Sequence, residues 1–293
     1  MTDNYRLIAE KSVVITGATS GIGLAAAIKF TQEGAFVIGI GRSAARIDQA
    51  RQKLKAAHPN SQVIFLLADL GDQNQVHGLG DKIKAALTQY GYHHLDVLIN
   101  NAGVYLEKKH KTADGIEMTF AVNHLAPFIL THELFASLKQ SQCGRVLTVT
   151  SYSHRITPLI LKRITNPYPY ISFLAYKRSK LCNVLFTYEF NHRFNSVEAF
   201  AVDPGLVNTR LVSKSENGLF AWFGRQRTLK GTSTDVPVKT LLFLSSEDEI
   251  DISNGYYFKD SQSQTPSLNA RRRDLAQDLW ELSSQLTGTN WDK

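Results

Sequence analysis

Cysteine is scarce in this sequence, and long hydrophobic runs are missing. Cys143 and Cys182 are the only two cysteines in 293 residues, which excludes a disulfide framework and is typical of a reducing compartment. No stretch approaches the roughly 18 uninterrupted apolar residues of a membrane span, so the sequence predicts no transmembrane helix. The first residues lack the basic patch and apolar run of a signal peptide, and we therefore expect a cytoplasmic protein.

Acidic residues are outnumbered by basic ones, with 26 Asp and Glu against 33 Lys and Arg, and the formal net charge is +7. The positive residues are mostly scattered, and their one block, Arg271–Arg273, is short, so the charge favours a solvated surface over a nucleic-acid interface. The histidines and cysteines form no cluster with metal-ligand spacing, and we expect no metal site. A Gly-x-Ser-x-Gly turn is also missing, which argues against a hydrolase.

Short apolar strand patterns alternate with helical patterns along most of the chain. Strands are expected at Ser12–Thr16, Ala35–Ile40, Gln62–Ala68, Leu95–Ile99, Arg145–Thr150, Val197–Val202 and Gly255–Phe258. Helices are expected at Ile22–Glu33, Ala44–Ala57, Asn74–Tyr90, Gly115–Gln140, Ala175–Phe194 and Val236–Ser245. Short all-apolar strands between helices predict a parallel sheet covered on both faces. The expected fold class is therefore α/β, a single Rossmann-type domain (1–293) with a doubly wound sheet of about seven strands.

Three parts of the chain depart from this simple alternation. Pro127 lies inside one expected helix, where it predicts a bend. The excursion 206–235 is interpreted as a substrate loop. The segment 260–293 is interpreted as a C-terminal tail.

A glycine-rich turn follows the first strand and opens the first helix. Gly17 allows a tight turn, while Gly21 and Gly23 let the backbone and the helix approach a pyrophosphate closely. Glycines are common in turns, so the weight of the pattern comes from its place between a strand and a helix. The residues expected to contact a dinucleotide here are Gly17, Thr19, Ser20, Gly21, Ile22 and Gly23.

The end of the second strand bears on which dinucleotide would bind. A cofactor without a 2′-phosphate is usually held there by an acidic side chain, and Gly41 supplies none. Arg42 supplies a planar cation suited to a phosphate, and Ser43 either contacts that phosphate or caps the next helix. The pattern favours NADP(H) over NAD(H), with Arg42 as an ordinary surface residue as the alternative.

Tyr176 and Lys180 form a Tyr-x-x-x-Lys pair on an expected helix, where residues four apart share a face. A free phenol has a pKa of about 10, and a nearby ammonium lowers that pKa, so Tyr176 could exchange a proton with a carbonyl or alcohol. Such pairs are frequent by chance. This one gains weight from Ser151, which ends the fifth strand, where a doubly wound sheet places its ligand. Ser151 could hold the substrate oxygen, and a turn cap is the alternative.

The order and spacing of these motifs resemble the short-chain dehydrogenase/reductase family, from about Ser12 to Gly255. The sequence is most similar to the branch of retinol dehydrogenases and WW-domain oxidoreductases. This likeness is carried by Asn123–Leu125, Ala175–Phe186 and Leu279–Ser283. The same stretches resemble light-dependent protochlorophyllide reductase, but the long insertion of that enzyme before its tyrosine is missing. The apolar N-terminal anchor of many retinol dehydrogenases is also missing from this sequence.

The resemblance implies a catalytic set of Asn123, Ser151, Tyr176 and Lys180, in which the tyrosine transfers the proton. The asparagine is expected to bend its helix and to hold a water that links the lysine to solvent. His124, beside it, is interpreted as structural or as a support for the catalytic residues, since the tyrosine already fills the role of the base. The family's long tyrosine helix often forms subunit contacts, which makes a homodimer or homotetramer the candidate assembly.

The resemblance also implies cofactor contacts at the adenine ring, along the cofactor and at the nicotinamide carboxamide. The residues implied are Asp69, Leu70, Asn101, Ala102, Gly103, Tyr176, Lys180, Pro204, Gly205, Val207 and Thr209. Turns and helix caps are the alternative at several of these positions.

The resulting hypothesis is an NADP(H)-dependent oxidoreductase that interconverts a carbonyl and an alcohol. Apolar residues at Pro158–Leu161, Pro167–Tyr170 and Leu219–Phe223 favour a hydrophobic substrate, although core packing or a subunit contact explains them as well. A catalytically silent NADP(H) sensor is the alternative, which the intact catalytic set disfavours. A scaffolding protein would need no glycine loop.

Overall fold

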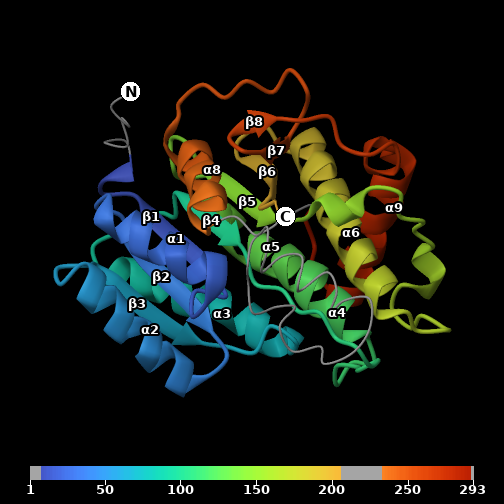
Figure 1. Cartoon of the computed structure of the whole chain (residues 1–293), viewed down its shortest axis with the longest axis horizontal. Coiled ribbons are helices and arrows are strands. Elements are labelled where there is room, and N and C mark those ends of the chain that lie inside the picture. The colour runs from blue at the N-terminus through green and yellow to red at the C-terminus, as the bar shows by residue number, and fades with distance from the viewer. Residues whose placement is uncertain (1–7, 206–232, 292–293) are drawn as a thin grey trace.

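The computed structural model describes residues 8–205 and 233–291, and a twisted sheet forms its centre (Figure 1). Within these residues the sheet has eight strands in the order β3-β2-β1-β4-β5-β6-β7-β8. The strands are β1 Ser12–Thr16, β2 Phe36–Gly41, β3 Val63–Leu67, β4 Val97–Asn100, β5 Arg145–Val149, β6 Glu198–Asp203, β7 Tyr257–Lys259 and β8 Gln262–Ser263. Every pairing is parallel except that of β7 with β8. The order reverses between β1 and β4, which is where doubly wound sheets bind ligands.

Helices cover both faces of the sheet (Figure 1). They are α1 Gly21–Gln32, α2 Ala44–Ala57, α3 Gln73–Gln89, α4 Met118–Phe120, α5 Ala126–Leu138, α6 Ser172–Arg193, α8 Asp235–Ser246 and α9 Arg273–Thr287. Side chains of α1, α2 and α8 share one apolar core with the sheet, and those of α3, α5 and α6 share the other. The central strands are buried on both faces, which explains their nearly continuous apolar sequence. The expected α/β fold class is confirmed.

One expected helix is not continuous. The pattern from Gly115 to Gln140 forms α4, a π-helical turn at Ala121–Leu125, and then α5. Pro127 therefore lies in the first turn of α5, where its missing N–H breaks no helical hydrogen bond. The irregular part of this helix is the π-helical turn, which contains an extra residue in the turn and ends before Pro127.

The tail contains structure that the sequence pattern did not predict. It forms β8 and the amphipathic helix α9, which packs alongside α6 (Figure 1). The Trp280 ring stacks on Phe186 at 5.7 Å and meets Phe128 edge-on at 5.1 Å. Subunit contacts were expected on α6, and one side of this helix is covered by α9 of the same chain. The excursion 206–235 lies almost entirely outside the described residues.

We expect Trp280→Ala to lower the free energy of unfolding by about 3–5 kcal/mol, because a buried ring between two helices leaves a cavity when removed. Trp280 is only 4% exposed. Urea denaturation followed by circular dichroism measures the change. Glu281→Ala, at the next and exposed position of α9, serves as the matched control and should stay within about 0.5 kcal/mol of the wild type. Equal effects of both substitutions would contradict a packing role for Trp280.

Candidate active site

Two loops at the carboxyl ends of β1 and β4 are bonded to each other. The Thr16 hydroxyl oxygen accepts hydrogen bonds from the backbone N–H groups of Asn101 (2.9 Å) and Ala102 (3.0 Å). The Asn101 side-chain amide donates to the Thr16 carbonyl at 2.8 Å. A Cβ added at Gly17 would lie 3.0 Å from Ala102 Cα, and one at Gly23 would overlap the Gly17 carbonyl. The glycines therefore permit a close approach between the two loops.

The N-termini of α1 and α2 are left without a side-chain cap. Ser20 and Ser43 occupy the cap positions, and neither side chain accepts a hydrogen bond from its helix. By contrast, Asp72 caps α3 by accepting from the backbone N–H groups of Asn74 and Gln75. Free N–H groups at the positive end of a helix dipole attract anions. Both helix ends that were predicted to meet the cofactor phosphates therefore fit such groups.

The end of β2 has no room for an acidic side chain. A Cβ at Gly41 would lie 2.6 Å from the Thr19 methyl carbon and 3.0 Å from Ile47 Cγ1. Arg42 is exposed and makes no hydrogen bond or ion pair within the described part of the chain. The position that usually selects a cofactor without a 2′-phosphate is thus sterically closed, beside a guanidinium that remains available.

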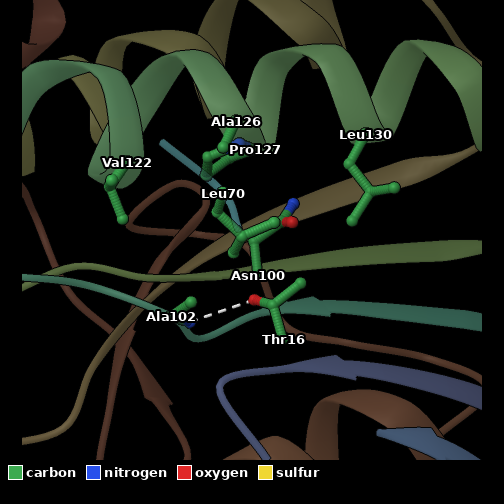
Figure 2. Close-up of a pocket in the computed structure, with 8 residues that line it drawn as sticks. All are labelled: Thr16, Leu70, Asn100, Ala102, Val122, Ala126, Pro127 and Leu130. Carbon is green, nitrogen blue, oxygen red and sulfur yellow. Dashed lines mark hydrogen bonds between the residues drawn. The ribbon is translucent and has the colours of Figure 1, made fainter. Parts of the chain in front are cut away.

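Asp69 and Leu70, the predicted adenine contacts, have local roles as well. Asp69 is exposed, and its carboxylate accepts a hydrogen bond from the Gly71 N–H at 2.9 Å, which is the turn-cap alternative. Leu70 lines a crevice behind the two bonded loops, together with Val122, Ala126 and Pro127 (Figure 2). This crevice is too narrow for a water molecule, so it is part of the packing.

Tyr176 and Lys180 face each other near the start of α6. The Lys180 ammonium lies 5.6 Å from the centre of the Tyr176 ring and donates a hydrogen bond to the Val149 carbonyl at 2.9 Å. The Thr150 hydroxyl donates to the Lys180 carbonyl, which joins α6 to the end of β5. Burial lowers the pKa of Lys180 to about 8, because the charged form loses its hydration.

Asn123 lies in the π-helical turn and is fully buried. Its side-chain oxygen accepts from the Val104 N–H at 2.7 Å, and its amide donates to the Val104 carbonyl at 3.0 Å and to the Ser179 hydroxyl at 2.9 Å. A Cβ at Gly103 would lie 3.4 Å from the Asn123 oxygen and 3.6 Å from the Lys180 nitrogen. The predicted site residues Asn123 and Lys180 therefore both lie next to Gly103. The water assigned to Asn123 stays a prediction.

Ser151 caps a short 3-10 turn, Tyr152–His154, by accepting from the Ser153 N–H at 3.2 Å. The turn-cap alternative for Ser151 is therefore present, and its hydroxyl proton is still able to bond a substrate oxygen. The Ser151 carbonyl accepts a hydrogen bond from Nδ1 of the buried His154 at 2.8 Å.

The loop after β6 is anchored through a buried acid. The Gly205 N–H donates to Asp203 at 2.9 Å, and the Tyr257 hydroxyl donates to the other oxygen of that carboxylate at 2.5 Å. The His154 ring lies 4.8 Å from the Tyr257 ring, which connects this loop with the Ser151 turn. His154 and Tyr257 were missed by the sequence reasoning, because no motif marks a partner so distant in sequence. Pro204 and Gly205 are described, whereas Val207 and Thr209 lie outside the described residues.

His124 is structural, as the sequence reasoning held. It is buried, with Nε2 at 2.9 Å from the Ser283 hydroxyl of α9 and Nδ1 at 3.4 Å from the Asn183 side-chain oxygen of α6. Burial lowers the pKa of His124 to about 4, so the ring is neutral at physiological pH.

A family model described as short chain dehydrogenase matches residues 11–219. The chain belongs to the short-chain dehydrogenase family. Mouse retinol dehydrogenase 12 is 34% identical over 284 residues, which cover 96% of this chain and 88% of the relative. Human polyprenol dehydrogenase is 31% identical, with 95% and 86% covered. A crystal structure of a protein from Mycobacterium paratuberculosis has a TM-score of 0.71 at 30% identity, with 97% and 96% covered.

These relatives identify a member of the retinol dehydrogenase-like branch, as the sequence motifs predicted. This short-chain dehydrogenase is an oxidoreductase of alcohols and carbonyls. Over residues 8–205 and 233–291, no helix is long and apolar enough to cross a bilayer. The same residues contain no group of three or more His, Cys, Asp or Glu side chains arranged to hold a metal ion.

The depressed pKa of Lys180 predicts a pH-dependent stability for this short-chain dehydrogenase. Between about 8 in the folded state and 10.5, the unfolded chain binds more protons at this site than the folded chain, so stability rises with pH across that window. The unfolding free energy of the wild type minus that of Lys180→Met should therefore rise from about pH 7 to about pH 9.5.

Urea denaturation at the two pH values measures this difference. Lys82→Met removes an exposed lysine and is the matched control, whose stability should track the wild type. If the difference in unfolding free energy between the wild type and Lys180→Met stays constant with pH, the lowered pKa of Lys180 is refuted.

Proposed function

We propose that this short-chain dehydrogenase interconverts a hydrophobic aldehyde or ketone and its alcohol with NADP(H), and that Tyr176 is the general acid and base. The observation that carries the proposal is the position of Tyr176. It lies beside the Lys180 ammonium, on a helix bonded both to the end of β5 and, through Asn123, to the loop after β4.

The residues present fit a bound dinucleotide. Gly17 and Gly23 leave space beside the loop after β1, and the uncapped ends of α1 and α2 offer N–H groups to phosphates. Arg42 would pair with a 2′-phosphate, while the closed position at Gly41 disfavours the acid that binds a free ribose. The nicotinamide ring, when bound, supplies or accepts the hydride.

The side chains of the chain itself handle the proton. The Ser151 hydroxyl would hydrogen bond to the substrate oxygen, and Tyr176 would donate its phenolic proton to that oxygen during reduction. The Lys180 ammonium stabilises the resulting phenolate, and with a pKa of about 8 it is mostly charged at neutral pH. Asn123 holds the loop after β4 against α6, which keeps these groups in register.

Two observations support a hydrophobic substrate. The relatives are named for retinol and polyprenol, which are both long apolar alcohols. In addition, the segment between Ser151 and Tyr176 exposes large apolar side chains, among them Ile156 at 91% and Tyr168 at 85%. The apolar residues that favoured a hydrophobic substrate in the sequence differ in exposure. Ile160 and Tyr168 are exposed, while Leu159 and Leu161 pack against the core. The stretch Leu219–Phe223 lies outside the described residues.

Tyr176→Phe should lower kcat by about 10²- to 10⁴-fold, because it removes the transferable proton and leaves the ring. NADPH oxidation is followed by absorbance with retinaldehyde, a medium-chain aldehyde and glyceraldehyde as the polar comparator. Tyr90→Phe, at an exposed tyrosine that ends α3, is the control and should keep full activity. Full activity in Tyr176→Phe would refute the assigned acid, and turnover confined to glyceraldehyde would refute the substrate class.

Arg42→Ala should weaken NADPH binding by on the order of tenfold or more and leave NADH binding unchanged, because only NADPH carries the phosphate that a guanidinium would pair with. Fluorescence titration of each nucleotide gives the two dissociation constants. Arg46→Ala removes an exposed arginine in the first turn of α2, four residues further along the chain, and controls for net charge. Equal losses for NADPH and NADH, or for both variants, would argue against a 2′-phosphate site at Arg42.

A further inference from the structure

Tyr105, in the loop after β4, contacts α6 at two successive turns. Its ring meets the Tyr176 ring nearly at a right angle, with centroids 5.9 Å apart and an interplanar angle of 72°. Its hydroxyl lies 2.7 Å from the hydroxyl oxygen of Ser172, which precedes Tyr176 by one helical turn. Edge-to-face aromatic pairs are favourable beyond the area they bury. The side chain therefore links the loop directly to the proposed catalytic phenol.

The backbone beside Tyr105 is held just as firmly. Val104, its neighbour, exchanges two hydrogen bonds with the Asn123 side chain. Asn123 also donates to the Ser179 hydroxyl, which in turn donates to the Tyr176 carbonyl at 2.7 Å. These contacts form a closed circuit from Tyr105 through Val104, Asn123 and Ser179 back to Tyr176.

We propose that Tyr105 is a positioning residue for Tyr176: its ring fixes the orientation of the catalytic phenol, and its hydroxyl anchors the ring to Ser172. This inference rests on the proposed role of Tyr176 as the acid. Proton transfer requires the phenol oxygen within hydrogen-bond range of the substrate oxygen, and a misplacement of about 1 Å costs up to about 10² in rate. The Tyr176 ring is only partly buried, and contact with the neighbouring Tyr105 ring restricts its rotamers on that side.

The two phenols are chemically distinct, which supports separate roles. Burial raises the pKa of Tyr105, so that Tyr105 stays a neutral hydroxyl bonded to Ser172. Tyr176 instead has the Lys180 ammonium 5.6 Å from its ring centre. Tyr105 is therefore suited to packing and hydrogen bonding, whereas Tyr176 has a cation beside its ring.

Three substitutions separate the two contacts of Tyr105. Tyr105→Leu removes the ring, whereas Tyr105→Phe keeps the ring and removes the hydroxyl. Ser172→Ala removes the same hydrogen bond from the side of α6. Steady-state kinetics with NADPH and the aldehyde that the wild type reduces best give kcat and KM, and fluorescence titration gives the NADPH dissociation constant.

Tyr105→Leu should lower kcat by about 10- to 100-fold, with KM and the NADPH dissociation constant within about twofold of the wild type. Tyr105→Phe should lower kcat by only about threefold, and Ser172→Ala should match that loss. The double variant Tyr105→Phe/Ser172→Ala should be no worse than either single one, because both remove one bond.

Wild-type kcat in Tyr105→Leu overturns the positioning role, and so does a loss of NADPH affinity as large as the loss of kcat. A Tyr105→Phe variant as impaired as Tyr105→Leu would also overturn it, since the ring would then contribute nothing. Failure of the proposed function is distinguished by Tyr176→Phe: if that variant remains active, or if the wild type turns over no substrate, the role of Tyr105 fails together with the acid it positions. If Tyr176→Phe is inactive, the result for Tyr105 stands on its own.

Discussion

The side-chain amide of Asn123 joins segments that the sheet alone would leave independent. Its oxygen and nitrogen both bond Val104, and the nitrogen also bonds Ser179 beside the lysine. The π-helical turn Ala121–Leu125 presents this side chain in the buried space between the loop after β4 and α6. An unpaired buried amide costs free energy, so the Val104 N–H, the Val104 carbonyl and the Ser179 hydroxyl are held in one arrangement around Asn123. The positions of Lys180 and Tyr176 relative to Gly103 and the loop after β4 depend on these hydrogen bonds of Asn123.

The fold was largely predictable, because the strands are buried on both faces and therefore consist of short apolar runs. Residues Ser12–Thr16 and Ala44–Ala57 have the predicted bounds to the residue. Helix α9 was missed although Leu275, Leu279 and Ser283 follow a helical period, because the pattern does not reveal which surface it covers. The π-helical turn itself was not predicted, although the family resemblance implied that Asn123 bends its helix, and the turn contains that residue.

The candidate site likewise contains some residues that were predicted from the sequence and others that were not. Gly17, Tyr176 and Lys180 were predicted from the sequence because the roles proposed for them fix their residue types and spacing. Tyr105, His154 and Tyr257 were not, because each acts through a partner that lies near it only in the folded chain. Asp69 and Ser151 show a further limit, since each makes the local turn contact that would explain it without any ligand. A local hydrogen bond leaves further acceptor or donor capacity, so the two roles are compatible.

The position of α9 has a consequence for how the molecule is assembled during translation. The Trp280 ring that covers one side of α6, and the Ser283 hydroxyl that pairs with His124, belong to a segment that is synthesised after all the strands of the sheet. The parallel pairs formed by β1 to β4 use only the first 100 residues and are complete much earlier. Aromatic side chains of α5 and α6 therefore have no partner from α9 until that later segment has been synthesised. Until then these side chains are an apolar surface of the kind that promotes aggregation.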